Sequence, residues 1–131
     1  MIMESYLTVL NEAGEESFKM YKKYGSVALL TVTPSVIYNY IFRQSHKMCT
    51  KGCKSFKADK ACWYTCYFRA ITLVIAAIRR DLGQVNSVPD RNQREALKNR
   101  LEAEDTRWQE KYETLKRKLE LAREKEREEI K

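Results

Sequence analysis

The sequence predicts an all-α fold: a helical hairpin with twin Cys-x3-Cys pairs, an N-terminal amphipathic helix and a long C-terminal coiled-coil-like helix. With only 4 Gly and 2 Pro in 131 residues, the chain cannot make the many tight turns of a β-sandwich or barrel. Apolar residues recur at steps of three and four, which is the period of a helix. Charged residues make up 33% of the chain, more than the usual quarter, and suit long solvated helices.

The N-terminal segment, residues 4–24, is expected to form the amphipathic helix. Its apolar positions follow the helical period, and glutamates and lysines fill the positions between them. These apolar positions are Leu7, Leu10, Gly14, Phe18 and Tyr21. Gly25 and Ser26 are expected to close or bend this helix.

A stretch of 19 uncharged residues then precedes Arg43. Thr33 followed by Pro34 is typical of an N-cap with proline at the first helical position, so a helix is expected over 34–52. The β-branched residues of 27–33 allow at most a short extended piece before it.

A third helix is expected over residues 60–82, with Asp59 as its N-cap and Gly83 as its C-terminal stop. It is apolar almost all round, and a helix of that kind is buried in protein or in lipid. The chain thus divides into an apolar hairpin domain, 1–83, a linker, 84–89, and a long charged helix.

The charged helix is expected over residues 90–131, where neither Gly nor Pro occurs. A heptad-like seam runs along it, and a solvated helix of this length is marginal without a partner. The predicted helix interface consists of Leu101, Trp108, Tyr112, Leu115 and Leu119. This last third of the chain is expected to be too polar to share in a common core.

Four cysteines form two pairs at i,i+4 spacing, Cys49 with Cys53 and Cys62 with Cys66, so that each pair shares one helical face. An antiparallel hairpin that turns between the pairs would set Cys53 against Cys62 and Cys49 against Cys66, as nested bridges. A zinc site of four thiolates, with His46 as a further ligand, stays open as an alternative. Four free, partly buried thiols are the third interpretation.

The twin Cys-x3-Cys arrangement resembles that of the small mitochondrial intermembrane-space chaperones. The resemblance covers only Cys49–Cys66, and in those chaperones a longer loop separates the pairs and no long C-terminal helix follows. It implies nested disulfides and an oxidising compartment such as the intermembrane space. It does not carry over chaperone activity.

The net charge of +7 is concentrated around the cysteines, since residues 43–60 carry six basic side chains and one aspartate. The lysines of this predicted basic patch are Lys47, Lys51, Lys54, Lys57 and Lys60. Such a patch can meet phosphates, anionic lipid or an acidic protein surface, and it can equally be a solvated loop.

Two segments come close to the length of a membrane span, which takes about 20 apolar residues. In residues 24–42 the case is weakened by Pro34 and Asn39. In residues 61–78 Arg69 lies near the centre, at a cost of about 2.5–3.5 kcal/mol. Burial in protein and contact with a membrane both stay open.

Catalytic chemistry finds no support in the sequence. The single histidine, His46, is expected at the surface, no glycine-rich phosphate loop occurs, and no metal or cofactor site is predicted. The leading hypothesis is a non-enzymatic structural or assembly subunit, such as an accessory subunit of a membrane complex or a small virion component. Its expected partners are other protein subunits and, as an open alternative, a membrane. The second hypothesis is a module that binds anionic lipid or nucleic acid through residues 43–60, with nucleic acid the less favoured partner.

Overall fold

Helices make up every regular element in the part of the chain that the computed structural model describes, residues 14–53 and 60–130, which confirms the all-α prediction. Residues 14–24 are helical, as predicted for this part of the N-terminal helix, whereas Leu7 and Leu10 lie outside the described residues. The elements that follow are η1 (Gly25–Leu30), α2 (Pro34–Thr50), α3 (Ala61–Gln84), η2 (Val85–Ser87) and α4 (Arg91–Ile130).

The helix boundaries follow local chemistry at most positions. Gly25 has a φ of 69°, a left-handed conformation that glycine adopts without steric cost, and it ends the helix of residues 14–24. Thr33 and Pro34 begin α2 as predicted. The carboxylate of Asp90 accepts a hydrogen bond of 2.9 Å from the backbone N–H of Gln93 and so caps α4.

The short segment before α2 forms the 3-10 helix η1, which is consistent with the expectation of at most a short extended piece at 27–33. Two other expectations about local structure need correction. α3 continues through Gly83 to Gln84, because the chain goes on into η2 without needing a left-handed residue there. Lys60 stands at the N-cap of α3 without a side-chain cap, while Asp59 lies outside the described residues.

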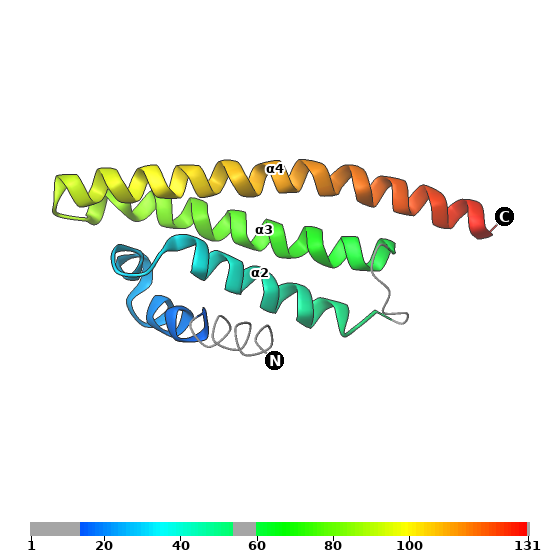
Figure 1. Ribbon diagram of the computed structural model, residues 1–131, viewed down its shortest axis with the longest axis horizontal. Coiled ribbons are helices and arrows are strands. Elements are labelled where there is room, and N and C mark those ends of the chain that lie inside the picture. Colours follow the sequence, from blue (N-terminus) through cyan, green and yellow to red (C-terminus); the bar gives the residue numbers. More distant parts are fainter. Residues whose placement is uncertain (1–13, 54–59, 131) are drawn as a thin grey trace, which may run out of the picture.

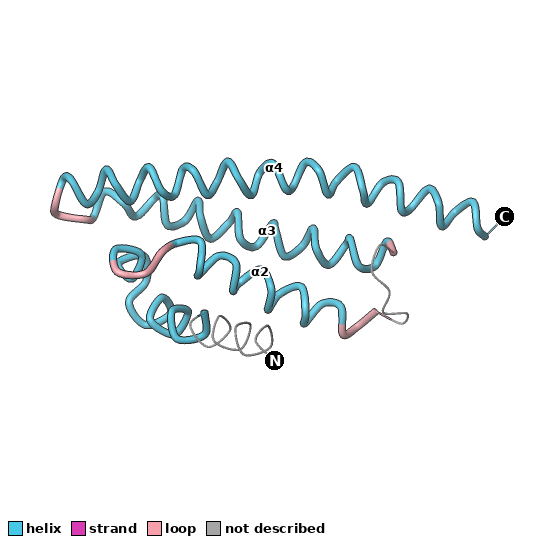
Figure 2. The backbone as a smooth tube through the Cα atoms, in the orientation of Figure 1, coloured by secondary structure: helices cyan, strands magenta, loops and turns pink. Residues whose placement is uncertain are grey.

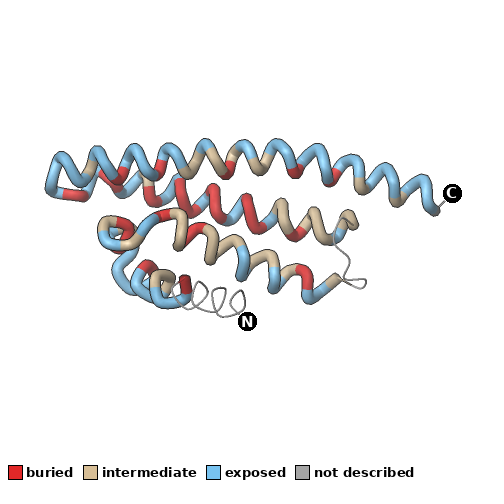
Figure 3. The backbone as a smooth tube through the Cα atoms, in the orientation of Figure 1, coloured by how far each residue is buried: buried red, intermediate tan, exposed pale blue. Residues whose placement is uncertain are grey.

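α3 lies at the centre of the fold, with α4 antiparallel along one side and α2 antiparallel along the other (Figure 1). The helix of residues 14–24 runs beside α2 on the side away from α4, as the backbone trace also shows (Figure 2). The buried positions gather where α3 meets its neighbours, and much of the outward surface of α4 is exposed (Figure 3).

One apolar core extends across the predicted linker into the charged helix. Tyr38 of α2 and Ile71 of α3 are fully buried in it, and Leu101 and Trp108 of α4 join them. The expectation that the last third of the chain is too polar to share the core was therefore wrong. A single face of α4 provides the apolar side chains, which leaves its many charges on the solvent side.

Candidate functional site

Two disulfides fasten the end of the hairpin formed by α2 and α3. Cys49 is bonded to Cys66 and Cys53 to Cys62, with Cα–Cα distances of 5.4 and 6.2 Å. Both distances lie within the range that disulfide geometry allows. These are the nested pairs expected from the i,i+4 spacing, and all four cysteines are bonded. The zinc and free-thiol alternatives do not describe this oxidised state.

The two bridges differ in their exposure. Cys66 is buried, at 2% relative exposure, and Cys62 is exposed. The sulfurs of Cys53, Cys62 and Cys66 lie within 4.8 Å of one another. A disulfide sulfur is not a thiolate, so these atoms could hold a metal ion only after reduction. Closing the nine-residue separation of the inner bridge stabilises the hairpin by about 2–3 kcal/mol through loop entropy.

The fastened end is also tied to α4 by two polar contacts. The backbone N–H of Ala61, in the first turn of α3, donates a hydrogen bond of 2.8 Å to the carboxylate of Glu126. The ammonium of Lys60 lies 3.8 Å from Glu129. An acidic side chain at a helix N-terminus satisfies a free donor and complements the helix dipole. Glu126 therefore does for α3 what a local N-cap residue does for other helices.

The described part of the predicted basic patch surrounds this end. Lys47 and Lys51 are exposed on α2 and just after it, and Lys60 is half-buried beside Glu129. Lys54 and Lys57 lie outside the described residues. The positive charge of this patch is thus partly balanced by the acidic C-terminal turns of α4.

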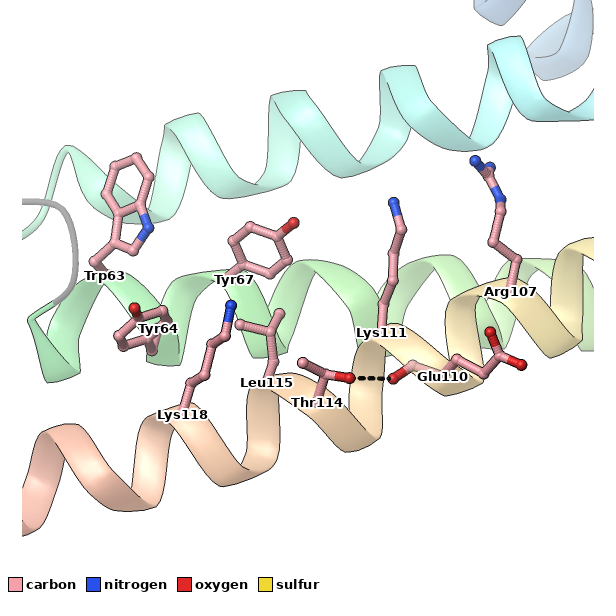
Figure 4. A pocket seen from close by; sticks show the side chains of 9 residues that line it. All are labelled: Trp63, Tyr64, Tyr67, Arg107, Glu110, Lys111, Thr114, Leu115 and Lys118. Carbon is pink, nitrogen blue, oxygen red and sulfur yellow. Dashed lines mark hydrogen bonds between the residues drawn. The ribbon is translucent and has the colours of Figure 1, made fainter.

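A different cationic surface lies in a groove of about 550 Å³ between α3 and α4, which we call the cationic groove. Aromatic rings of α3 and long basic side chains of α4 line it. Figure 4 shows Arg107 and Lys111 reaching past α3 in the direction of α2, on the same side as Trp63 and Tyr67. The lining residues are Trp63, Tyr64, Tyr67, Arg107, Glu110, Lys111, Thr114, Leu115 and Lys118.

Two of these cations share one indole ring. The ammonium of Lys111 lies 4.5 Å from the ring centroid of Trp108, and the guanidinium of Arg107 lies 5.1 Å from it. Arg107 also contacts Glu104 at 2.8 Å. The pKa of Lys111 is lowered, first because burial disfavours its charge and second because Arg107 repels it, while Glu104 acts in the opposite direction.

His46 was expected at the surface, but it is half-buried and lies among aromatic rings. Its ring centroid is 4.3 Å from that of Trp63 and 5.3 Å from that of Tyr67, and its ring is stacked on Phe42. Its Nε2 is buried and has no hydrogen-bond partner among the described residues. Burial lowers the pKa of His46, and a hydrogen bond with the Trp63 backbone offsets part of this shift. In this position the imidazole ring packs against its aromatic neighbours.

A buried carboxylate joins three helices at the other end of α3. Asp81 is 1% exposed, and its Oδ2 accepts hydrogen bonds of 2.7 Å from the hydroxyls of Tyr21 and Tyr38. Arg80 donates a 2.7 Å hydrogen bond to the Tyr21 oxygen, and its Nε lies 3.9 Å from Asp81. Burial and the neighbouring carboxylate raise the pKa of Tyr21 to about 12, against the influence of Arg80, and the pKa of Tyr38 also rises. We call these four residues the Asp81 network.

The predicted helix interface of α4 faces the chain's own interior. Leu101 and Trp108 are at most 1% exposed, and Leu115 and Leu119 are each 6% exposed. Tyr112 is half-buried, with its ring 4.6 Å from that of Phe68 in α3. This face of α4 is therefore filled within one chain.

Of the two candidate membrane segments, residues 24–42 do not form one span, because the turn at 31–33 separates η1 from α2. Among the described residues one helix, Ala61–Ser87, is long and apolar enough to cross a bilayer by length and composition. The core helix of a soluble protein passes the same test. Only 33% of its apolar 18-residue window is buried within the chain.

Comparisons with protein-family models, with curated proteins and with solved structures found no match for this chain. Sequence reasoning had singled out neither the cationic groove nor the Asp81 network. Spacing gave one usable signal, since Arg107, Lys111 and Lys118 recur at four and seven residues and so lie on one face of a helix.

Proposed function

We propose that this chain is a non-catalytic structural subunit of a larger assembly, in which neighbouring protein subunits cover the outer face of its apolar helix α3. The incomplete burial of α3 is the observation that supports the proposal. A window apolar enough for a membrane span is only 33% buried within the chain. Leu73, near the middle of α3, keeps 56% of its surface exposed. Apolar side chains that gather on one exposed face mark a site of protein or membrane contact.

The shape of the exposed surface supports a docking role. Leu73 stands at an open groove of about 470 Å³ that Phe18 and Ile41 also line, so side chains of three helices meet there. The disulfides at one end of α3 and the Asp81 network at the other hold these helices in fixed positions. Fixed helices lose little conformational entropy when a partner binds.

The described side chains also support a role without catalysis. The one histidine has its Nε2 buried among aromatic rings. The hydroxyls of Tyr21 and Tyr38, whose pKa values are raised, both donate hydrogen bonds to the buried Asp81. An acid or base that must exchange protons with a substrate needs access to it.

Association of the full-length, oxidised chain in solution tests the proposal. We expect concentration-dependent association at micromolar protein in size-exclusion chromatography with light scattering. Replacing Leu73 with glutamate should weaken it, because a charge in an apolar contact must be desolvated. Leu121→Glu is the matched control, since Leu121 is 65% exposed on α4, away from this face.

Two results would count against the proposal. A monodisperse monomer that unfolds in one cooperative step without partner or detergent would remove the need for covering subunits. Association that vanishes in mild detergent, together with partition of the chain into lipid vesicles, would point to lipid as the cover of α3.

The second candidate function is the binding of an anionic surface by the basic patch. The exposed positions of Lys47 and Lys51 beside the disulfides favour it. Neutralising about five phosphates predicts that log K falls with log salt at a slope of about −3.5 to −4.5. An affinity that does not change with salt would eliminate this function.

A further inference from the structure

The cationic groove combines features that neither a core nor an ordinary solvated surface needs. Its floor consists of aromatic rings of α3, and Leu115 closes it as a buried apolar residue. Three basic side chains of α4 border it, and Glu110 is its one acidic lining residue. Its volume of about 550 Å³ falls in the usual range for sites of small organic ligands.

The positive charge of the groove is energetically unfavourable in the absence of a bound anion. Arg107 and Lys111 are spaced i,i+4 on one helix, where like charges repel each other. Among the described residues, no carboxylate lies within ion-pair distance of Lys111 or Lys118, whereas Arg107 is paired with Glu104. The Nε of Arg107 is buried and lacks a hydrogen-bond partner in the described part of the chain. A bound anion would offset the repulsion between these cations, because it would pair with the half-buried Lys111 and the exposed Lys118.

We propose that the cationic groove binds an amphipathic organic monoanion, with its apolar body on Trp63, Tyr67 and Leu115 and its anionic group between Lys111 and Lys118. The body excludes water from the aromatic floor, and the anionic group pairs with the ammonium groups of Lys111 and Lys118, which have no carboxylate partner among the described residues. Arg107 is already paired with Glu104, and Glu110 offsets one of the two lysine charges, so the remaining excess of one positive charge suits a single anionic group. The volume likewise suits a single small molecule.

The test uses the full-length, oxidised chain and two fluorescent probes that share an anilinonaphthalene body. One probe, 1-anilinonaphthalene-8-sulfonate, carries an anionic group, and the other, N-phenyl-1-naphthylamine, is neutral. We expect the sulfonate to bind at one equivalent per chain and about tenfold more tightly than the neutral probe. Equal affinities for the two probes would overturn the proposal.

A charge-removing variant locates the site. Lys111→Met keeps the aliphatic stem and should weaken binding of the sulfonate about five- to tenfold, with little effect on the neutral probe. Lys116→Met is the matched control, because Lys116 is an exposed lysine of α4 outside the groove. If circular dichroism shows that Lys111→Met does not fold, Lys118→Met carries the same expectation. Sulfonate affinity that is unchanged in the folded groove variant would also overturn the proposal.

Displacement of the bound sulfonate shows whether the groove prefers a single-chain lipid acid or an aryl acid. Decanoate represents single-chain lipids and 2-naphthoate represents aryl acids, with decanol and 2-naphthol as their neutral controls. Displacement by either acid, but not by its alcohol, supports the proposal and names the class. Displacement by the alcohols at equal concentration, or by none of the four, contradicts it. The outcome is independent of the proposed assembly role, because association is tested at Leu73 and anion binding at Lys111.

Discussion

Removing the carboxylate of Asp81 should be among the most damaging single changes in this protein. The side chain is 1% exposed and accepts two hydrogen bonds of 2.7 Å, from Tyr21 and Tyr38. A hydrogen bond to a charged group contributes about 1.5–3 kcal/mol, and Asp81→Ala leaves two buried hydroxyls without their acceptor. Release of the buried charge from its desolvated site offsets part of this loss. We expect the free energy of unfolding to fall by about 3–5 kcal/mol, out of about 5–15 kcal/mol for a domain of this size.

Urea denaturation followed by circular dichroism, with the disulfides intact, measures this loss. Asp81→Asn keeps the shape and an accepting oxygen, so it should cost less, about 1–2 kcal/mol. Glu113→Ala controls for loss of a carboxylate, because Glu113 is exposed on α4. In the double variant with Tyr38→Phe, the total loss should be smaller than the sum of the two single losses, since one unsatisfied hydroxyl disappears. A loss below about 1 kcal/mol for Asp81→Ala, or strict additivity with Tyr38→Phe, would refute this account of the Asp81 network.

Four further predictions follow from the packing of the hairpin and of α4. Non-reducing mass spectrometry should give a mass lower than that of the fully reduced chain by four hydrogen atoms, and four alkylatable thiols would contradict the two bridges. The pKa of His46, measured by NMR, should lie below 6.5 because burial disfavours the charged ring. The free energy of unfolding should fall as the pH drops below 6.5, since the unfolded chain then binds the proton more readily than the folded chain. A pKa at or above 6.5 would contradict the place of His46 among the aromatic rings. Glu126→Ala should cost about 0.5–2 kcal/mol and speed hydrogen exchange at the amide of Ala61, whereas Glu124→Ala, at an exposed neighbouring position, should do neither. Trp108→Ala should lower the free energy of unfolding by about 3–5 kcal/mol, because the ring is 1% exposed within the chain, and unchanged stability would mean that this face of α4 is not part of the core.

The predictions that held rest on local patterns. Thr33 and Pro34 marked the start of α2, because proline fits the first turn of a helix, where its missing N–H costs nothing. The i,i+4 spacing of the cysteines placed each pair on one helical face, and the bridges Cys49–Cys66 and Cys53–Cys62 followed once α2 and α3 were antiparallel. Such patterns depend on neighbours within one or two helical turns, so they can be recognised in the sequence without knowledge of the tertiary structure.

The cationic groove and the Asp81 network were missed because their members are distant in sequence. Asp81 lies 60 residues from Tyr21 and 43 from Tyr38, and nothing near it in the chain marks it as buried. In the sequence, Arg107 and Lys111 resemble the other cations of a solvated helix. Only the packing of α4 against α3 places them beside aromatic rings. His46 was expected at the surface because lysines surround it in sequence, whereas aromatic residues surround it in space.

Local sequence patterns alone predict that this chain is helical, roughly where its helices begin and end, which cysteines can pair and which face of α4 must be buried. Each of these follows from the 3.6-residue period of the helix and from short-range preferences for proline, glycine and apolar side chains. The folded chain shows what the patterns do not, namely that the chain's own α3 covers that face. It also shows that a carboxylate at Glu126 caps α3 and that Asp81 joins three helices. Short segments of the sequence do not specify these contacts, because contacts between helices depend on the relative placement of the helices in space, which results from packing the whole core.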